Sequence, residues 1–274
     1  MPDLITLARA KQAIPSVPSA DDAIVEDLID AASEMIEHYC RRTFALTTYD
    51  EIANGRFDGR LRLKQFPIVT VTRIAASNGA ALRVVNENTS LNQRATVRIT
   101  TTGLVLTRVA SGVTSTDSSI LWSGHATVQS AANAITALGN GWKGTAVVAF
   151  ASWPPTDLRP LGVALPCLTT PAELVIHDRE VPATNIDSDA GFVFGDFPPG
   201  DGNLRVEYSA GYATIPEVVQ QACAMLVAQC YAEGKHDASL RFEGLGDAQY
   251  SRFKPEGLPE AVRRLLAPWR NLMA

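Results

Sequence analysis

The spacing in this 274-residue sequence that most resembles a binding site lies between residues 185 and 196. Asn185, Asp187, Asp189 and Asp196 occupy positions one, three, five and twelve of a calcium-binding loop, where oxygen ligands are needed. Position six, which requires glycine, is Ala190, and the flanking residues have the pattern of strands rather than helices. We therefore favour a β-turn between two strands, with a cation site as the alternative.

The remaining reactive side chains form no recognisable catalytic pattern. The four histidines are scattered and have no partner four residues away. Cys223 and Cys230 lie about 10 Å apart along one predicted helix, too far for a disulfide, and we interpret all four cysteines as reduced packing residues. The sequence has no phosphate-binding glycine-rich loop with its lysine, no H-E-x-x-H, no G-x-S-x-G and no CxxC motif. We predict that the protein is not an enzyme and has no cofactor and no metal.

The composition indicates a globular protein that does not coat nucleic acid. Hydrophobic residues make up 46% of the chain and charged residues 19%, and the net charge is −5. A negative chain does not bind DNA through its phosphates, although DNA can pass its surface without adhering. No apolar run reaches the roughly 18 residues of a membrane span, and the first residues lack the pattern of a signal peptide. We expect no membrane contact and synthesis in a cytoplasm.

A long amphipathic helix is predicted from Ser19, as its N-cap, to about Arg41. Apolar residues recur along one side with helical spacing, and carboxylates occupy the other side. We interpret the acidic side as a solvated face, with a channel lining or a contact with a basic partner as the alternative. The candidate channel-facing residues are Asp22, Glu26, Asp30, Glu34 and Glu37.

A second helix is predicted between Pro216, which suits the first helical position, and Gly234, which suits a helix end. Residues 222–228 carry no polar side chain, so this helix must be covered on nearly all sides, and neighbouring subunits are a possible source of that cover. The basic end of the tail is a further candidate for contact with an acidic neighbour, with a solvated helix end as the alternative. The candidate interface with another subunit or with a partner protein comprises Ala222, Met225, Leu226, Arg263, Arg264, Trp269 and Arg270.

The pattern of the whole chain predicts an α+β fold with two domains. We expect a helical core, made of the long N-terminal helix and the buried C-terminal helix, with short antiparallel β-strands. Residues 78–158 are rich in Thr, Ser, Ala, Asn and Gly, which suggests a small inserted α+β domain. The predicted division is a core domain of residues 1–77 plus 159–274 and an inserted domain of residues 78–158.

Several segments in this order resemble the head–tail connector proteins (adaptor or head-completion proteins) of long-tailed bacteriophages. The resemblance covers roughly residues 4–76 and 160–270, and its strongest part is Val206 to Tyr212 followed by Ile215-Pro216 and the alanine-rich helix. It also includes residues 5–11, 27–44, 61–71 and 258–270, with the Arg-Arg-Thr-Phe exit from the long helix. Residues 78–158 depart from the compact members of this family.

This resemblance implies a structural virion protein that is made in the host bacterial cytoplasm and sits in the phage neck. Its members form a ring, commonly a dodecamer, between the portal protein and the tail or stopper protein, and DNA passes through without specific binding. Because family members are not enzymes, no catalytic residue is transferred. The alternatives are another virion component, such as a stopper or tail-completion protein, and a surface-binding module built on the inserted domain. The latter requires Trp122, Trp142 and Trp153 to be exposed on one face.

Overall fold

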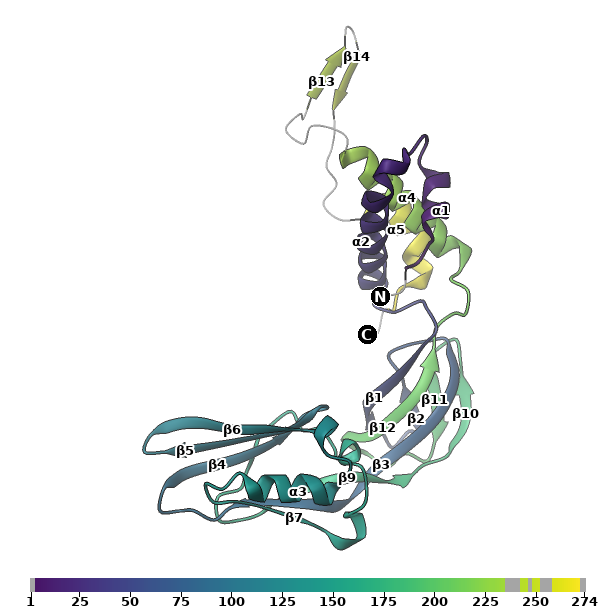
Figure 1. The fold of residues 1–274 in the computed structure, drawn as a ribbon. Coiled ribbons are helices and arrows are strands. Elements are labelled where there is room, and N and C mark those ends of the chain that lie inside the picture. The colour runs from purple at the N-terminus through teal and green to yellow at the C-terminus, as the bar shows by residue number, and fades with distance from the viewer. Residues whose placement is uncertain (1–2, 235–241, 246–247, 252–257, 272–274) are drawn as a thin grey trace.

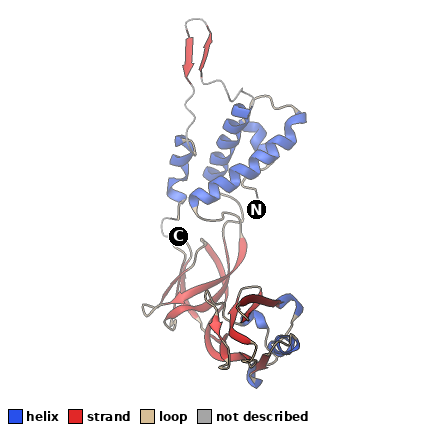
Figure 2. Ribbon diagram, turned by 90° about the vertical axis from the view of Figure 1, so that its left-hand side faces the viewer, coloured by secondary structure: helices blue, strands red, loops and turns tan. Residues whose placement is uncertain are grey.

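A computed structural model describes residues 3–234, 242–245, 248–251 and 258–271. The molecule is elongated, with helices at one end, a twisted β-sheet in the middle and a smaller unit of strands and one helix at the other end (Figure 1). Figure 2 shows the same division, with the long helices above the large sheets. Three apolar cores follow this division, one in each part of the molecule.

The helical end consists of α1 (Leu7–Ala13), α2 (Asp22–Cys40), α4 (Glu217–Gly234) and α5 (Glu260–Leu266) around one apolar core. Both long helices are present as predicted, and α2 packs against α4. The predicted cap is wrong, because Ser19 begins a 3₁₀ turn (Ser19–Asp21) and Asp21 is the residue before α2. Another 3₁₀ turn, Ala267–Trp269, follows α5.

Helix α4 is buried on most sides, as its apolar sequence predicts. From Val219 to Tyr231 only Gln221 is exposed. The cover comes from the chain itself, because α1, α2 and α5 contribute the other side chains of this core. Burial of this apolar surface therefore stabilises the single subunit and needs no neighbouring copy.

The middle of the molecule is an antiparallel sheet in the order β1-β12-β3-β7, with β9 also paired to β3. A second sheet, β10-β11-β2, packs against it, and both contribute side chains to one core. The strands are β1 (Thr47–Gly55), β2 (Arg60–Arg62), β3 (Ile68–Asn86), β7 (Trp142–Ala146), β9 (Ala172–Glu180), β10 (Ala183–Asp187), β11 (Phe192–Gly195) and β12 (Gly200–Ala210).

The far end combines the sheet β6-β5-β4-β8 with helix α3 (Val128–Ala137), which starts at a capping box formed by Thr127 and Ser130. One apolar core joins this sheet, α3 and the adjoining part of β3, β7 and β9. The strands are β4 (Asn92–Ile99), β5 (Gly103–Ala110), β6 (Val113–Leu121) and β8 (Leu165–Pro166). Beyond the helical end, β13 (Phe242–Leu245) pairs with β14 (Ala248–Ser251).

The predicted fold class is wrong. Strands account for 39% of the described residues and helices for 31%, and the long strands form antiparallel sheets rather than short additions to a helical core. Strand β3 alone has 19 residues. Two of the three apolar cores lie on sheets, because the β-branched and alternating segments pair over long distances in the chain.

Strand β3 also passes through Asn78-Gly79, a pair of residues typical of turns. The pairing with β9 shifts register between Ser77 and Gly79, so the extra residue forms an irregularity within the strand instead of a turn. A Cβ atom on Gly79 would lie 2.8 Å from the Phe150 ring, which explains the glycine. The predicted boundary at residues 77 and 78 falls inside β3, and the division into a core and an inserted domain stays a prediction.

Candidate functional site

The helical end is joined to the central sheet by an arginine surrounded by aromatic rings. Arg42 follows the C-terminus of α2 and is only 5% exposed. Its guanidinium carbon lies 4.1 Å from the centre of the Phe66 ring, 5.1 Å from that of Phe44 and 5.6 Å from that of Tyr212. It also donates a hydrogen bond to the Phe66 carbonyl oxygen, and burial lowers its pKa. Cation–π contacts with three rings keep this buried charge in place.

The Gly-Tyr segment before α4 forms the second half of this joint. The Gly211 N–H donates to the Pro67 carbonyl at 2.9 Å, and the Tyr212 N–H donates to the Phe44 carbonyl at 2.8 Å. Gly211 has a φ of +112°, and a Cβ atom there would lie 2.4 Å from the Ala45 carbonyl oxygen. Only glycine fits this position, so the Gly-Tyr signal identified in the sequence sets the path from sheet to helix.

Two predicted interface residues lie at the same joint. The Trp269 ring packs edge-on against Tyr212 at 5.9 Å and against Phe44 at 6.2 Å. The Arg270 guanidinium lies over the Tyr39 ring at 4.7 Å. Both residues thus have contacts within the subunit, and Trp269 is half-buried whereas Arg270 is exposed.

The other predicted interface residues divide between the core and the surface. Ala222 and Leu226 are buried in the helical core, and Met225 packs against it. Arg263 and Arg264 are exposed on α5 and pair with Glu260 at 2.9 and 3.0 Å. Of the three predicted interface residues on α4, Met225 is the one that is partly exposed, so a partner would meet the α5 arginines more readily than these α4 residues.

Glu37 is set apart from the other predicted channel-facing carboxylates by its burial. It is 6% exposed, and its Oε1 accepts a hydrogen bond from the Phe44 N–H at 3.0 Å. Burial raises the pKa of this carboxyl above its usual value of 4.5. Glu37 therefore fixes the exit of the chain from α2 and does not face solvent.

The rest of the predicted acidic set stays on the surface of α2. Glu26, Asp30 and Glu34 are exposed, whereas Asp22 is half-buried and pairs with Lys11. Asp3 lies against this face, and a hydrogen bond with Asp30, together with partial burial and the Asp30 charge, raises the pKa of the Asp3 carboxyl. The surface formed by Asp3, Asp27, Asp30 and Glu34, which we term the acidic face, borders an open hollow of about 650 Å³.

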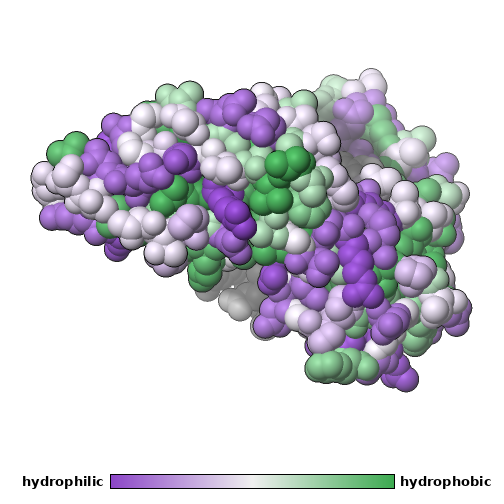
Figure 3. Space-filling model, turned by 90° about the horizontal axis from the view of Figure 1, so that it is seen from below, coloured by the Kyte–Doolittle hydropathy of each residue, from purple (hydrophilic) through white to green (hydrophobic). Residues whose placement is uncertain are grey.

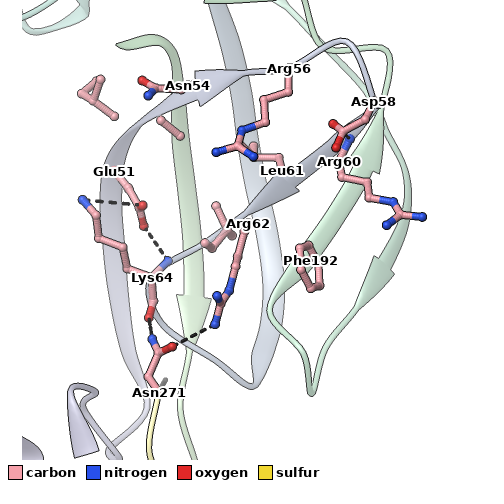
Figure 4. A pocket seen from close by; sticks show the side chains of 13 residues that line it. Glu51, Asn54, Arg56, Asp58, Arg60, Leu61, Arg62, Lys64, Phe192 and Asn271 are labelled. Carbon is pink, nitrogen blue, oxygen red and sulfur yellow. Dashed lines mark hydrogen bonds and ion pairs between the residues drawn. The ribbon is translucent and has the colours of Figure 1, made fainter. Parts of the chain in front are cut away.

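A larger hollow of about 690 Å³ lies on the central sheet, beside the turn that joins β1 to β2 (Figure 4). Sequence reasoning missed this site. The signal was the alternation from Arg60 to Lys64, which places Leu61 and Leu63 in the core and the basic side chains outside. We term it the basic pocket, and its charged lining residues are Glu51, Arg56, Asp58, Arg60, Arg62 and Lys64.

Part of the basic pocket is held rigidly. Arg62 donates to Asn271 Oδ1 at 2.8 Å, and the Asn271 side-chain amide donates to the Lys64 carbonyl at 3.3 Å. Glu51 accepts from the Lys64 N–H at 3.2 Å and from the Tyr208 hydroxyl at 2.8 Å. These bonds tie the pocket floor to the helix joint through Asn271, whose N–H donates to the Cys40 carbonyl.

The central sheet and the 3₁₀ turn Pro155–Asp157 are linked by an ion-pair network. Buried Asp157 pairs with Arg73 at 3.1 Å and with Arg205. Arg205 also pairs with Asp50 at 2.7 Å, and Arg73 with Glu180 at 2.8 Å. The network connects five separate parts of the chain, and its role is to hold them together.

The calcium-like spacing forms a hairpin turn. Asn185 and Asp187 belong to β10, the Ala190 N–H donates to Asp187 Oδ1 at 3.1 Å, and Gly191 closes the turn with a φ of +74°. This is the β-turn that we favoured. Within the described ranges, no group of three or more His, Cys, Asp or Glu side chains is placed to hold a metal ion. No described helix is long and apolar enough to cross a membrane.

The three tryptophans that a surface-binding module would expose belong to the core of the far end. Trp122 and Trp142 are buried, and Trp142 donates to Asp117 at 2.5 Å. Trp153 is half-buried and packs edge-on against Phe150 at 5.6 Å. Figure 3, which views this end from below, shows apolar residues interspersed with polar ones. The tryptophans do not form one exposed binding face.

Comparison with known proteins connects this architecture to one family. Residues 175–272 match the model of the family described as head completion protein. No curated protein sequence matches the chain significantly. The matched region begins in β9 and includes the Gly-Tyr segment, α4 and α5.

Two solved structures contain chains that align with this one. One, "Neck of empty GTA particle computed with C6 symmetry", matches at 15% identity with a TM-score of 0.42. The other, "Virion of native gene transfer agent (GTA) particle", matches at 17% identity with a TM-score of 0.36. Each match covers 99% of this chain and 91% of the other, and TM-scores this low support no conclusion on their own. The family match confirms the resemblance found in the sequence, because residues 175–272 of this chain match the head completion protein family.

Proposed function

We propose that this protein is a neck component of a phage-type virion, in which identical copies form a ring between the portal protein and the tail or stopper protein. DNA passes through the ring without specific binding, and the ring in the virion is a dodecamer. The observation that carries this proposal is the head completion match over residues 175–272. In this proposal the protein acts as a structural part and not as an enzyme.

The matched region supports the proposal because it contains the structural joint. Gly211, Tyr212 and Trp269 all lie within it, and together with Arg42 they set the direction of the helices against the sheet. A ring part must present surfaces at fixed angles to its neighbours, since a small error per subunit prevents closure. A rigid joint between two differently folded ends meets this requirement.

The charge distribution supports a passage for DNA rather than a DNA-binding role. The chain carries a net charge of −5, and Glu26, Asp30 and Glu34 are exposed along α2. Aligned carboxylates repel phosphates, so a channel lined by them does not retain DNA. In our proposal, these three residues are the channel-facing candidates, and buried Glu37 is not.

A stopper or tail-completion protein is the second candidate function, since the same family match is compatible with either. The surface-binding alternative has less support, because its three tryptophans pack into the far-end core. The two virion roles differ in where the protein binds, which an assembly experiment distinguishes.

The test is assembly with a portal. Purified protein would be analysed by light scattering and electron microscopy, alone and mixed with the portal protein from the same genome. We expect a ring with an open, DNA-sized hole seated on the portal. A protein that stays monomeric and never engages the portal would contradict the proposal, and one that binds only a portal already carrying another ring would be a stopper.

A further inference from the structure

The basic pocket contains two arginines that have no role within the subunit. Arg56 and Arg60 are exposed, and neither guanidinium has an ion-pair or hydrogen-bond partner among the described residues. Figure 4 shows Arg56 reaching over the pocket from the turn and Arg60 pointing outward at its rim. Arg62 and Lys64, in contrast, are tied to Asn271 and Glu51. The pocket thus has a rigid floor and an unpaired basic rim.

The turn that carries this rim also exposes an aromatic side chain. Phe57 lies between Arg56 and Asp58 and is 92% exposed. Large aromatic residues and arginines are enriched in protein–protein interfaces, because both bury substantial area when a partner covers them. An exposed phenylalanine beside unpaired arginines favours a protein partner at this pocket.

The acidic face of α2 has the complementary charge. Asp27, Asp30 and Glu34 follow one another at helical spacing and, with Asp3, border a hollow of their own. The hydrogen bond between Asp3 and Asp30 brings two carboxyl groups together, which raises the pKa of Asp3. Such crowding of like charges is relieved when a cation approaches.

We propose that the basic pocket of one copy receives the acidic face of a second copy, so that this contact is the repeating interface between subunits. The inference rests on the proposed ring and names its contact surfaces. It places Asp30 and Glu34 in the contact between copies, so that Glu26 remains the channel-facing candidate. The two surfaces belong to different parts of the chain, α2 and the β1–β2 turn. Each copy can therefore present its acidic face to one neighbour and bind the acidic face of another neighbour in its basic pocket. A head-to-tail contact of this kind is the type that closes into rings.

The chemistry of the pocket favours this partner over DNA. Its lining combines the four basic residues with Glu51 and Asp58, and the Asp58 carboxylate lies at the same turn as Arg56. A phosphate backbone carries only negative charge and would meet both carboxylates. A helix face with separated carboxylates can pair with the arginines and avoid Asp58.

Charge reversal tests the pairing. R56E/R60E reverses the rim, D27K/E34K reverses the acidic face, and the combination of all four changes restores complementarity. We expect each reversal to raise the protein concentration needed for ring assembly on the portal by at least tenfold, and the combined variant to recover assembly. The matched control is R94E/R98E, which makes the same charge change on β4 at two exposed arginines without partners among the described residues.

Zero-length cross-linking gives a readout that does not depend on ring formation. A carbodiimide joins a lysine amine to a carboxylate that contacts it. A mixture of isotope-labelled and unlabelled protein, with portal present, distinguishes links between copies from links within one copy. We expect links from Lys64 to Asp27, Asp30 or Glu34 of another copy. The link from Lys64 to Glu51 within one chain, at 3.7 Å, is the internal standard. Circular dichroism checks that each variant is folded.

The outcomes separate the inference from the proposed function. If rings form but the reversals have no effect and the cross-links are absent, the inference is overturned and the ring proposal stands. If the cross-linked pair forms while no ring assembles on the portal, the inference stands and the ring proposal fails. Loss of binding to a DNA fragment in R56E/R60E with unchanged assembly would identify a DNA site and overturn the inference.

Discussion

The Arg42 guanidinium lies 4.1 Å from the centre of the Phe66 ring, and this contact joins the end of the long helix to the entrance of the central sheet. Because Phe44 and Tyr212 enclose the same group, one buried cation connects segments that are far apart in the chain. The geometry of the whole molecule depends on this joint, and its parts can be tested one at a time.

Replacement of Arg42 should destabilise the protein. R42A removes the contacts with three rings and the bond to the Phe66 carbonyl, and we expect a loss of about 2–4 kcal/mol in the free energy of unfolding. R42K keeps the charge but not the planar group, so its loss should be nearly as large. Denaturant unfolding measures both, with exposed Arg94→Ala as the control; equal stabilities of R42A and R94A would refute the role of the joint.

Gly211→Ala should show whether the left-handed backbone before α4 is required. A methyl group would lie 2.4 Å from the Ala45 carbonyl oxygen, and the φ of +112° is unfavourable for alanine, so we expect a loss of about 2–4 kcal/mol. Gly234→Ala is the matched control, since a Cβ atom there meets nothing within 4 Å. Its effect on thermal unfolding should be neutral or slightly stabilising.

Glu37 should make stability depend on pH in a defined direction. Its pKa is raised in the folded state above 4.5, so the folded protein binds the proton more tightly than the unfolded chain. The contribution is fully present below pH 4.5 and is lost as the pH rises through the folded pKa. Glu37→Gln keeps an oxygen that accepts from Phe44, and this variant should be more stable than the wild type at pH 7 and equal to it at pH 4. If the free energies of unfolding of the two proteins differ by the same amount at every pH, the prediction is wrong.

Removal of the Asp157 carboxylate should release the ion-pair network. Asp157→Ala leaves Arg73 and Arg205 without their shared buried partner, and we expect a loss of about 2–4 kcal/mol in unfolding free energy. The exposed pair between Arg83 and Glu173 serves as the comparison, and Glu173→Ala should cost at most about 1 kcal/mol. If both substitutions lower the free energy of unfolding in urea by the same amount, Asp157 does not hold the network together.

The positions of the helices could be predicted from the sequence because their signals are local. Apolar spacing, the proline at residue 216 and the glycine at residue 234 identified the two long helices, and no distant residue was needed. The same holds for the turn at residues 187–191, where side-chain oxygens bond to nearby backbone groups. The alternation from Arg60 to Lys64 was equally local, but the hollow beside it also requires Asn271, which is over two hundred residues away.

The sheets could not be predicted in the same way, because strand pairing depends on segments that lie far apart in the sequence. Asn78-Gly79 has the composition of a turn, yet β9 pairs with β3 on both sides of it, and those bonds keep the strand continuous through an irregularity. For the same reason we predicted a mainly helical core, whereas the structure contains more strand than helix.

The order and spacing of nearby residues were enough to identify the two long helices, to require cover for α4 and to reveal the resemblance to head completion proteins. The three-dimensional fold was needed to show what covers α4, that Glu37 is buried while Glu26, Asp30 and Glu34 are exposed, and where the unpaired arginines gather. Those outcomes depend on which distant surfaces exclude water from one another, and local spacing does not specify that choice.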